Sequence, residues 1–237
     1  MEKVEYRRYI YSVKSRLLRR GFTAAAMIIL LSSCVSFESE EVGSRREIPR
    51  PADQNLSRIQ QELITGAERF LGARRLEVDG VRYNADCTGV VQAIYAYAGI
   101  DLRGPLNQYR GNGVARLNSY LSDLGLLYSS TQPVPGDLIF WDNSYDRNGD
   151  GQWNDKLTHV GMVVSVDPAG TVTYVHHNYR KGIVLARMNL LRPDTLVDGE
   201  ERINSAMRMR DGKSYPKWLS SHLYRELGQG WKIEGSG

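Results

Sequence analysis

Cys87 is the residue in this sequence best suited to attack a carbonyl carbon. Asp86 is a good N-cap, so Cys87 is expected to begin a helix that continues to a stop at Gly99. Free backbone N–H groups and the helix dipole at such a position favour a thiolate and can bind a developing oxyanion. A lone cysteine is nevertheless more often a buried structural residue. The catalytic interpretation therefore depends on a base nearby.

Three histidines are candidates for that base and for the group that orients it. His159 opens an apolar run and is expected at the head of a strand, from which it can reach a helix N-terminus. His176 and His177 end the next strand-like run. Because strand side chains alternate between faces, only one of this pair can meet His159, and spacing does not decide which. Taken singly, a histidine at a strand end is usually a solvated polar residue.

Helical patterns precede strand-like patterns along the chain. Apolar spacing predicts a helix from Ser57 to near Gly72, the helix that begins at Cys87, and a shorter helix over 117–126. Short runs rich in branched and aromatic residues follow at 137–141, 160–166, 171–177 and 182–188. Residues 218–227 are expected to form a helical cap. This order predicts an α+β fold with an antiparallel sheet.

Four motifs together resemble the NlpC-type papain-like cell-wall hydrolases, which are related to the CHAP type. They occur in that family's order: an Asp-Cys-Thr-Gly motif with an apolar pair, a Gly-Asp-Leu strand ending in aromatics, a His-apolar-Gly strand and an aromatic-apolar-His strand. These are residues 86–91, 136–141, 159–163 and 174–177. The resemblance implies a papain-like fold with N-terminal helices packed on the sheet.

The resemblance also implies roles for individual residues. Cys87 would be the nucleophile, His159 the general base and His176 the group that orients the imidazole, with His177 and Asn178 as alternatives for the third role. The residues at 72–83 lack the family's Gly-Gly pair, so Tyr83 is expected to take over the role of its tyrosine beside the nucleophile. Trp141, from the Gly-Asp strand, is the second candidate for substrate binding.

The loop over 146–155 has two interpretations. Its oxygen-bearing side chains alternate as in a calcium loop, with a glycine at the sharp turn, but the final bidentate carboxylate is replaced by Leu157. The alternative is a polar surface turn without metal. The calcium ligands would be Asp146, Asn148, Asp150, Asn154 and Asp155. The cysteine chemistry itself requires no cofactor.

The N-terminus has the layout of a bacterial lipoprotein. Residues 1–33 combine a basic start with a short apolar run, and Leu31-Ser32-Ser33-Cys34 resembles a lipobox, which implies a diacylated Cys34. An ordinary signal peptide or a short uncleaved anchor is the alternative. Residues 34–54 are expected to be a flexible tether and 55–237 the catalytic domain. The absence of aspartate after Cys34 favours the outer membrane.

Charge argues against a nucleic-acid partner. The 237 residues carry a net charge of +4, but residues 1–33 hold seven Lys/Arg against two Glu, a net of +5. The remainder therefore has a net charge of −1, with no basic footprint. We expect a monomer, anchored to the membrane by its lipid.

The sequence thus favours a cysteine peptidase that cuts the stem peptide or cross-link of peptidoglycan through a Cys-His-His triad. The alternatives are an amidase that cuts between sugar and peptide, an acyltransferase on the same scaffold, and a non-catalytic wall-binding lipoprotein. The last has no need of Cys87, His159 and His176 together.

Overall fold

The structure is a computed structural model that describes residues 55–209 and 217–233. The described residues all belong to one compact unit. The expected leader, the lipidation site Cys34 and the tether over 34–54 lie outside them. Within the described residues, no helix has the length and apolar character needed to span a membrane.

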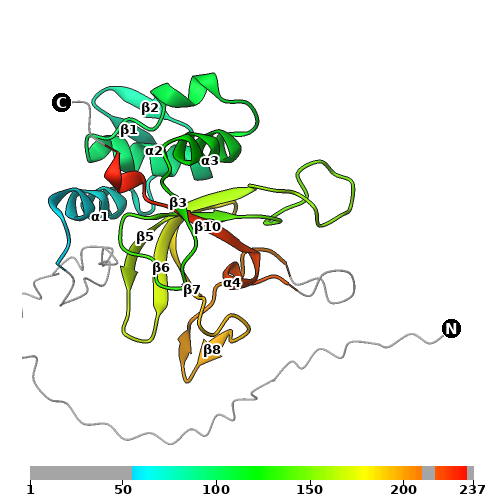
Figure 1. The fold of residues 1–237 in the computed structure, drawn as a ribbon. Coiled ribbons are helices and arrows are strands. Elements are labelled where there is room, and N and C mark those ends of the chain that lie inside the picture. The colour runs from blue at the N-terminus through cyan, green and yellow to red at the C-terminus, as the bar shows by residue number, and fades with distance from the viewer. Residues whose placement is uncertain (1–54, 210–216, 234–237) are drawn as a thin grey trace, which may run out of the picture. The chain divides into compact units, whose positions relative to one another are not determined.

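A six-stranded antiparallel sheet forms the centre of this unit (Figure 1). Its strand order is β3-β10-β4-β5-β6-β7, and two small hairpins, β1-β2 and β8-β9, lie outside it. The strands are β1 (Leu76–Val78), β2 (Val81–Tyr83), β3 (Leu127–Tyr128), β4 (Leu138–Trp141), β5 (His159–Val166), β6 (Thr171–Asn178), β7 (Gly182–Asn189), β8 (Val197–Asp198), β9 (Glu201–Arg202) and β10 (Tyr224–Gly228). The helices are α1 (Arg58–Phe70), α2 (Cys87–Tyr97), η1 (Gly104–Gln108), α3 (Gly113–Asp123), α4 (Ser220–Leu223) and η2 (Gly230–Lys232).

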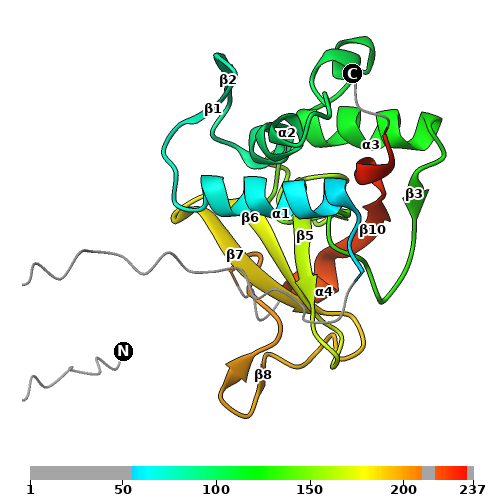
Figure 2. The ribbon, with the colours of Figure 1, turned by 90° about the vertical axis from the view of Figure 1, so that its left-hand side faces the viewer.

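Three helices cover one face of the sheet, as Figures 1 and 2 show for α1, α2 and α3. Helix α1 begins with a capping box, in which Ser57 and Gln60 bond each other's backbone N–H groups. The Gln60 amide also donates to the carbonyl of Pro135 at 2.7 Å, which ties α1 to the start of β4. The predicted α+β fold with N-terminal helices on an antiparallel sheet is confirmed.

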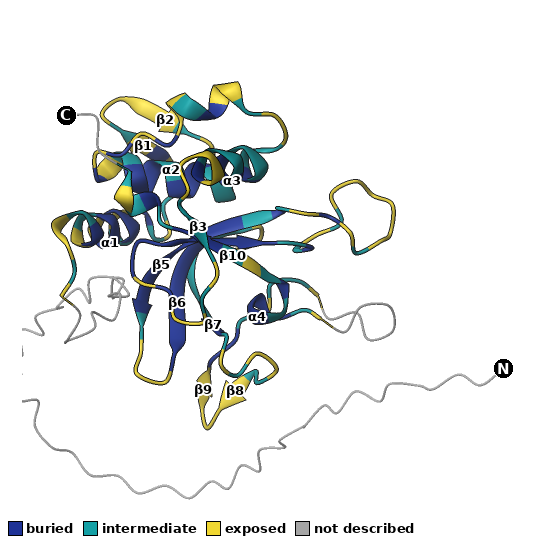
Figure 3. Cartoon of the chain, viewed as in Figure 1, coloured by how far each residue is buried: buried dark blue, intermediate teal, exposed yellow. Residues whose placement is uncertain are grey.

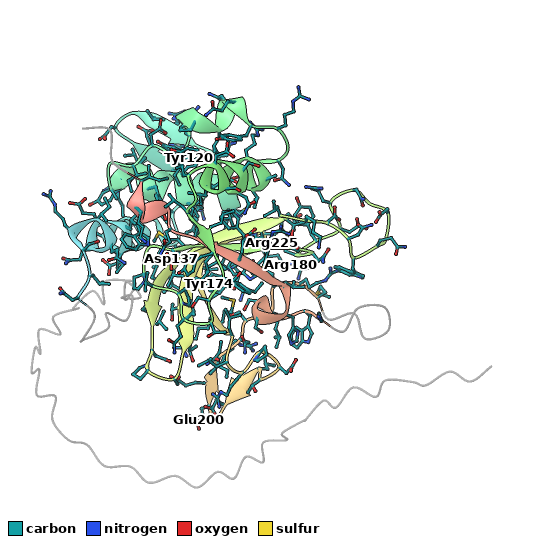
Figure 4. The ribbon with its side chains drawn as sticks, viewed as in Figure 1. Tyr120, Asp137, Tyr174, Arg180, Glu200 and Arg225 are labelled. Atoms are coloured by element: carbon teal, nitrogen blue, oxygen red, sulfur yellow. The ribbon has the colours of Figure 1, made fainter. Side chains whose placement is uncertain are left out.

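Alternation along the strands divides the buried side chains between two cores, and Figure 3 shows β5 and β6 buried along most of their length. The larger core joins the helices to strand residues such as Phe140, Met162 and Val175. The smaller core, on the opposite face, contains Trp141 and Tyr174 and includes Leu223 from α4. The sheet is therefore buried on both faces, which holds the strand ends in fixed positions.

The prediction of a helix over 218–227 is wrong. Only Ser220–Leu223 are helical, and the following residues form β10, which lies between β3 and β4 in the sheet. Leu227 pairs with Ile139 of β4 and with Tyr128 of β3. Pairing with strands distant in sequence stabilises an extended conformation that local spacing does not reveal.

Each of the longer helices begins directly after a residue whose side chain caps it. Helices α1 and α2 begin where expected, whereas α3 begins at Gly113, ahead of the expected 117–126. Asn112 caps α3, because its side-chain oxygen accepts from the N–H of Ala115 at 2.7 Å. The same amide donates to the carbonyl of Leu157 at 3.1 Å, so α3 is bonded to the segment that leads into His159.

Candidate active site

Cys87 is the first residue of α2, as predicted. The side chain of Asp86 accepts from the N–H of Gly89 at 2.7 Å and so caps the helix. Gly89 has no room for a side chain, because a Cβ there would lie 2.0 Å from the carbonyl oxygen of Asn84. The N–H of Cys87 has no partner among the described residues. That donor remains for an oxyanion, whereas the N–H of Gly89 is committed to the cap.

The thiol of Cys87 is protonated in its resting environment. Burial raises its pKa, and the charge of Asp86 raises it further, whereas N–H groups of Val160 and Thr88 that point at the sulfur lower it. The expectation that the helix N-terminus lowers the pKa of this thiol is corrected accordingly, because burial outweighs these donors. The contact with Val160 places the sulfur beside the residue that follows His159.

His159 and His176 are brought together at the ends of adjacent strands. Nε2 of His159 lies 2.9 Å from Nδ1 of His176, and the two rings meet edge to face. His176, rather than His177, is thus the partner that the sequence left undecided. Burial lowers the pKa of His159 well below its usual range and lowers the pKa of His176 to about 4. Both rings are therefore neutral at neutral pH.

No hydrogen bond between the Cys87 sulfur and the His159 ring is formed within the described part of the chain. The two residues approach each other through α2 and β5, which pack together, and through the bond from the N–H of Val160 to the sulfur. In the absence of substrate such catalytic contacts are often long and tighten only in the complex.

The Trp141 ring packs against the ring of His159. It is Trp141 that pairs with His159 across β4 and β5, and its ring centroid lies 5.7 Å from the imidazole. Its side chain is fully buried, and the indole N–H donates to the carbonyl of Ser220 at 2.8 Å. Trp141 therefore cannot touch a substrate, which corrects the expectation of a binding role.

Gly161, the glycine of the His-apolar-Gly motif, lies where a side chain has no room. A Cβ at this position would lie 2.8 Å from the carbonyl oxygen of Val175 and 3.3 Å from atoms of both His176 and Trp141. The missing side chain therefore lets the orienting histidine and the indole pack closely beside His159.

Tyr83 ends β2, four residues before the nucleophile, but it faces a hollow beside the far end of α2. Arg103 lies over its ring, 5.8 Å from the centroid. This placement differs from the expected role beside the nucleophile.

The loop over 146–155 is held mainly by its own backbone. The carboxylate of Asp146 accepts from the N–H groups of Gly149 and Gly151 at 2.8 Å each. Asp155 is turned inward and is paired with Arg147, whose Nε lies 3.5 Å from its carboxylate. Among the described residues, no group of three or more His, Cys, Asp or Glu side chains is placed to hold a metal ion. Asp155 is thus separated from the expected ligand set, and calcium binding stays a prediction.

Sequence reasoning missed Tyr145 as a site residue. It follows β4, and its side chain is about half exposed. Its pKa is raised by partial burial first and second by the negative charge that Cys87 carries once ionised, so it lies near the nucleophile. No motif singles it out, because it belongs to a loop whose path depends on tertiary contacts. Thr88 and Gly113 also meet, so that the N-termini of α2 and α3 converge at this site.

Comparison with known families agrees with this geometry. Residues 77–178, which include Cys87, His159 and His176, match the CHAP domain model. This segment, which is less than half of the 237 residues, is therefore similar to CHAP domains. None of the curated proteins matches the chain. The CHAP domain indicates a hydrolase of peptidoglycan, amidase or peptidase in general. Its matched segment spans β1 to β6 but stops before β7 and β10, which complete the sheet.

Proposed function

We propose that this protein is a cysteine hydrolase that cuts a peptide bond in the stem or cross-link of peptidoglycan. Cys87 is the nucleophile, His159 the general base and His176 the positioning residue. The observation that carries the proposal is the contact of 2.9 Å between His159 and His176, at the strand end next to the sulfur of Cys87.

The protonation states define the first step. For Nδ1 of His159 to act as a base, Nε2 must carry the ring proton and donate it in a hydrogen bond to Nδ1 of His176. Since the thiol and the imidazole are both neutral at rest, sulfur attack and proton transfer to Nδ1 occur together. The sulfur forms a bond to the carbonyl carbon, and the oxyanion meets the N–H of Cys87.

The second half of the reaction returns the proton. His159, now an imidazolium, protonates the leaving amine as the C–N bond breaks, which leaves a thioester on Cys87. Water then attacks the thioester with His159 again as base, and the thiol leaves with a proton. Because His176 is neutral, it orients the imidazolium but does not balance its charge, unlike the carboxylate of a Ser-His-Asp triad.

An amidase that cuts between sugar and peptide would use the same three residues, and it is the second candidate. A wall-binding protein without activity is disfavoured, because the His159–His176 contact and the uncommitted N–H of Cys87 have no role in binding alone.

The test is release of new amine groups from purified peptidoglycan by the full chain. We expect Cys87→Ala and His159→Ala to abolish release, and His176→Ala to reduce it about 10-fold to 100-fold. His176→Asn should restore part of the loss, because an amide can still accept from Nε2. Undiminished release by Cys87→Ala would refute the proposal, and mass spectrometry of the fragments distinguishes peptidase from amidase.

We also propose that the chain is a lipoprotein anchored through Cys34 to the outer membrane, with residues 34–54 as tether. This rests on the lipobox-like sequence. Labelling of wild type but not Cys34→Ala with a radioactive fatty acid would support it, and equal labelling of both would contradict it.

A further inference from the structure

A hollow of about 440 Å³ lies at the far end of α2 from Cys87. Strand β2, the end of α2, the segment that follows α2 and part of η1 surround it. Its wall is partly apolar, from Val81, Ala96 and Ile100, and partly polar, from Tyr83, Asp101 and Arg103. Such a mixture of apolar wall and a few polar groups is typical of ligand sites.

Arg103 is the cation that lines this hollow. Its guanidinium is held in place by neighbouring groups, but no carboxylate among the described residues pairs with it. It lies over the Tyr83 ring, and one of its N–H groups donates to the carbonyl of Arg82 at 3.3 Å. Across the residues that the structure describes, it forms no ion pair with a carboxylate. The neighbouring Arg82 differs, because its side chain is paired with Glu77 at 3.3 Å.

Asp101, the acidic residue of this hollow, does not neutralise the Arg103 guanidinium. The carboxylate of Asp101 accepts from the backbone N–H groups of Arg103 at 2.7 Å and of Gly104 at 3.1 Å. These bonds fix the turn that carries Arg103 and engage the Asp101 carboxylate with backbone N–H groups rather than with the guanidinium. A planar guanidinium held in this way is suited to a carboxylate.

The distance from the nucleophile fits a peptide substrate. Ala96 is nine residues after Cys87 on the same helix, which corresponds to roughly 13 Å along its axis. An extended peptide covers that length with about four residues. About four extended residues of a peptide therefore span the distance from a scissile bond at Cys87 to the hollow.

We propose that this hollow is a substrate subsite, in which Arg103 binds a carboxylate of the acidic peptide several residues from the bond that is cut. Tyr83 supports the guanidinium from below. The inference rests on the proposed function, because the peptide that would bind here is the substrate that Cys87 is proposed to cut.

Binding to full-length Cys87→Ala protein tests the subsite without hydrolysis. The probes are a stem tetrapeptide with free carboxylates and the same peptide with its side-chain carboxylates converted to amides. We expect calorimetry to show about tenfold tighter binding of the acidic peptide, and a weaker preference at high salt. Adding Arg103→Gln should remove the preference, and Arg103→Lys should keep part of it.

Arg82→Gln is the matched control, because Arg82 belongs to strand β2 beside Arg103 but its side chain is already paired with Glu77. It should leave the preference unchanged. Equal binding of the two peptides to the Cys87→Ala protein, or a preference that survives Arg103→Gln, would overturn the subsite. Neither result bears on the nucleophile, which the amine-release assay tests separately with wild type.

Discussion

The buried His176 should make the stability of the protein fall steeply in mild acid. Its side chain is 5% exposed, and its pKa is about 4, against 6.5 for an unburied histidine. As the pH falls through 6.5, His176 therefore becomes protonated in the unfolded chain but stays neutral in the folded protein. Stability that is fully present near neutral pH is lost between those two values.

The size of this effect follows from the two pKa values. The gap between about 4 and 6.5 corresponds to roughly 3 kcal/mol in the free energy of unfolding when the pH is below both. Near pH 4.5 most of it, about 2.5 kcal/mol, is already lost. His159 changes stability in the same direction, since burial lowers its pKa as well.

Urea unfolding of the full chain near pH 7 and near pH 4.5 measures the loss. We expect His176→Asn to reduce the loss by about 2 kcal/mol relative to wild type, because asparagine does not titrate. Tyr174→Phe is the control. Its ring centroid lies 5.2 Å from that of His176, and its removal of one hydroxyl leaves both histidines in place. Equal losses for wild type and His176→Asn would refute the claim that the ring is held neutral by burial.

Three further predictions concern the nucleophile and the loop. Gly89→Ala should destabilise the fold by about 3 kcal/mol or more, measured by urea unfolding, because its Cβ would collide with the backbone of Asn84. Alkylation of Cys87 by iodoacetamide should accelerate as the pH rises beyond the usual thiol range, since its pKa is raised; a rate that levels off below pH 7 would contradict the neutral resting state. The calcium hypothesis predicts a higher melting temperature in calcium than in chelator, with no difference for Asp146→Asn. Equal melting temperatures for wild type would favour a polar turn.

The site was largely predictable because its parts are local motifs. Asp86 and Cys87 specify a capped helix start, and the alternation of strand residues limits the third group to one of two histidines. The choice of His176 required the register of β5 and β6, which contains an irregularity between Val163 and Ser165. The burial of Trp141 and the placement of Tyr83 likewise depend on packing that no single segment encodes.

The fold shows the same division between local and long-range information. The hairpin β1-β2 was missed although its signal is local: Asp79-Gly80 stand between two alternating runs, with positive φ at both residues. The strand β10 could not be recognised from its own residues, because its partners β3 and β4 lie roughly 80 to 100 residues earlier.

We expect the insertion of β10 beside β4 to set the point at which the proposed activity can begin. Strand β4 carries Trp141, which backs His159, and one of its two neighbours is supplied only by Tyr224–Gly228. A growing chain that has emerged as far as Asn178 contains Cys87, His159 and His176, yet β4 still has an open edge. We therefore expect a fragment limited to 77–178 to aggregate, and newly made protein to remain inert until its last strand has been added.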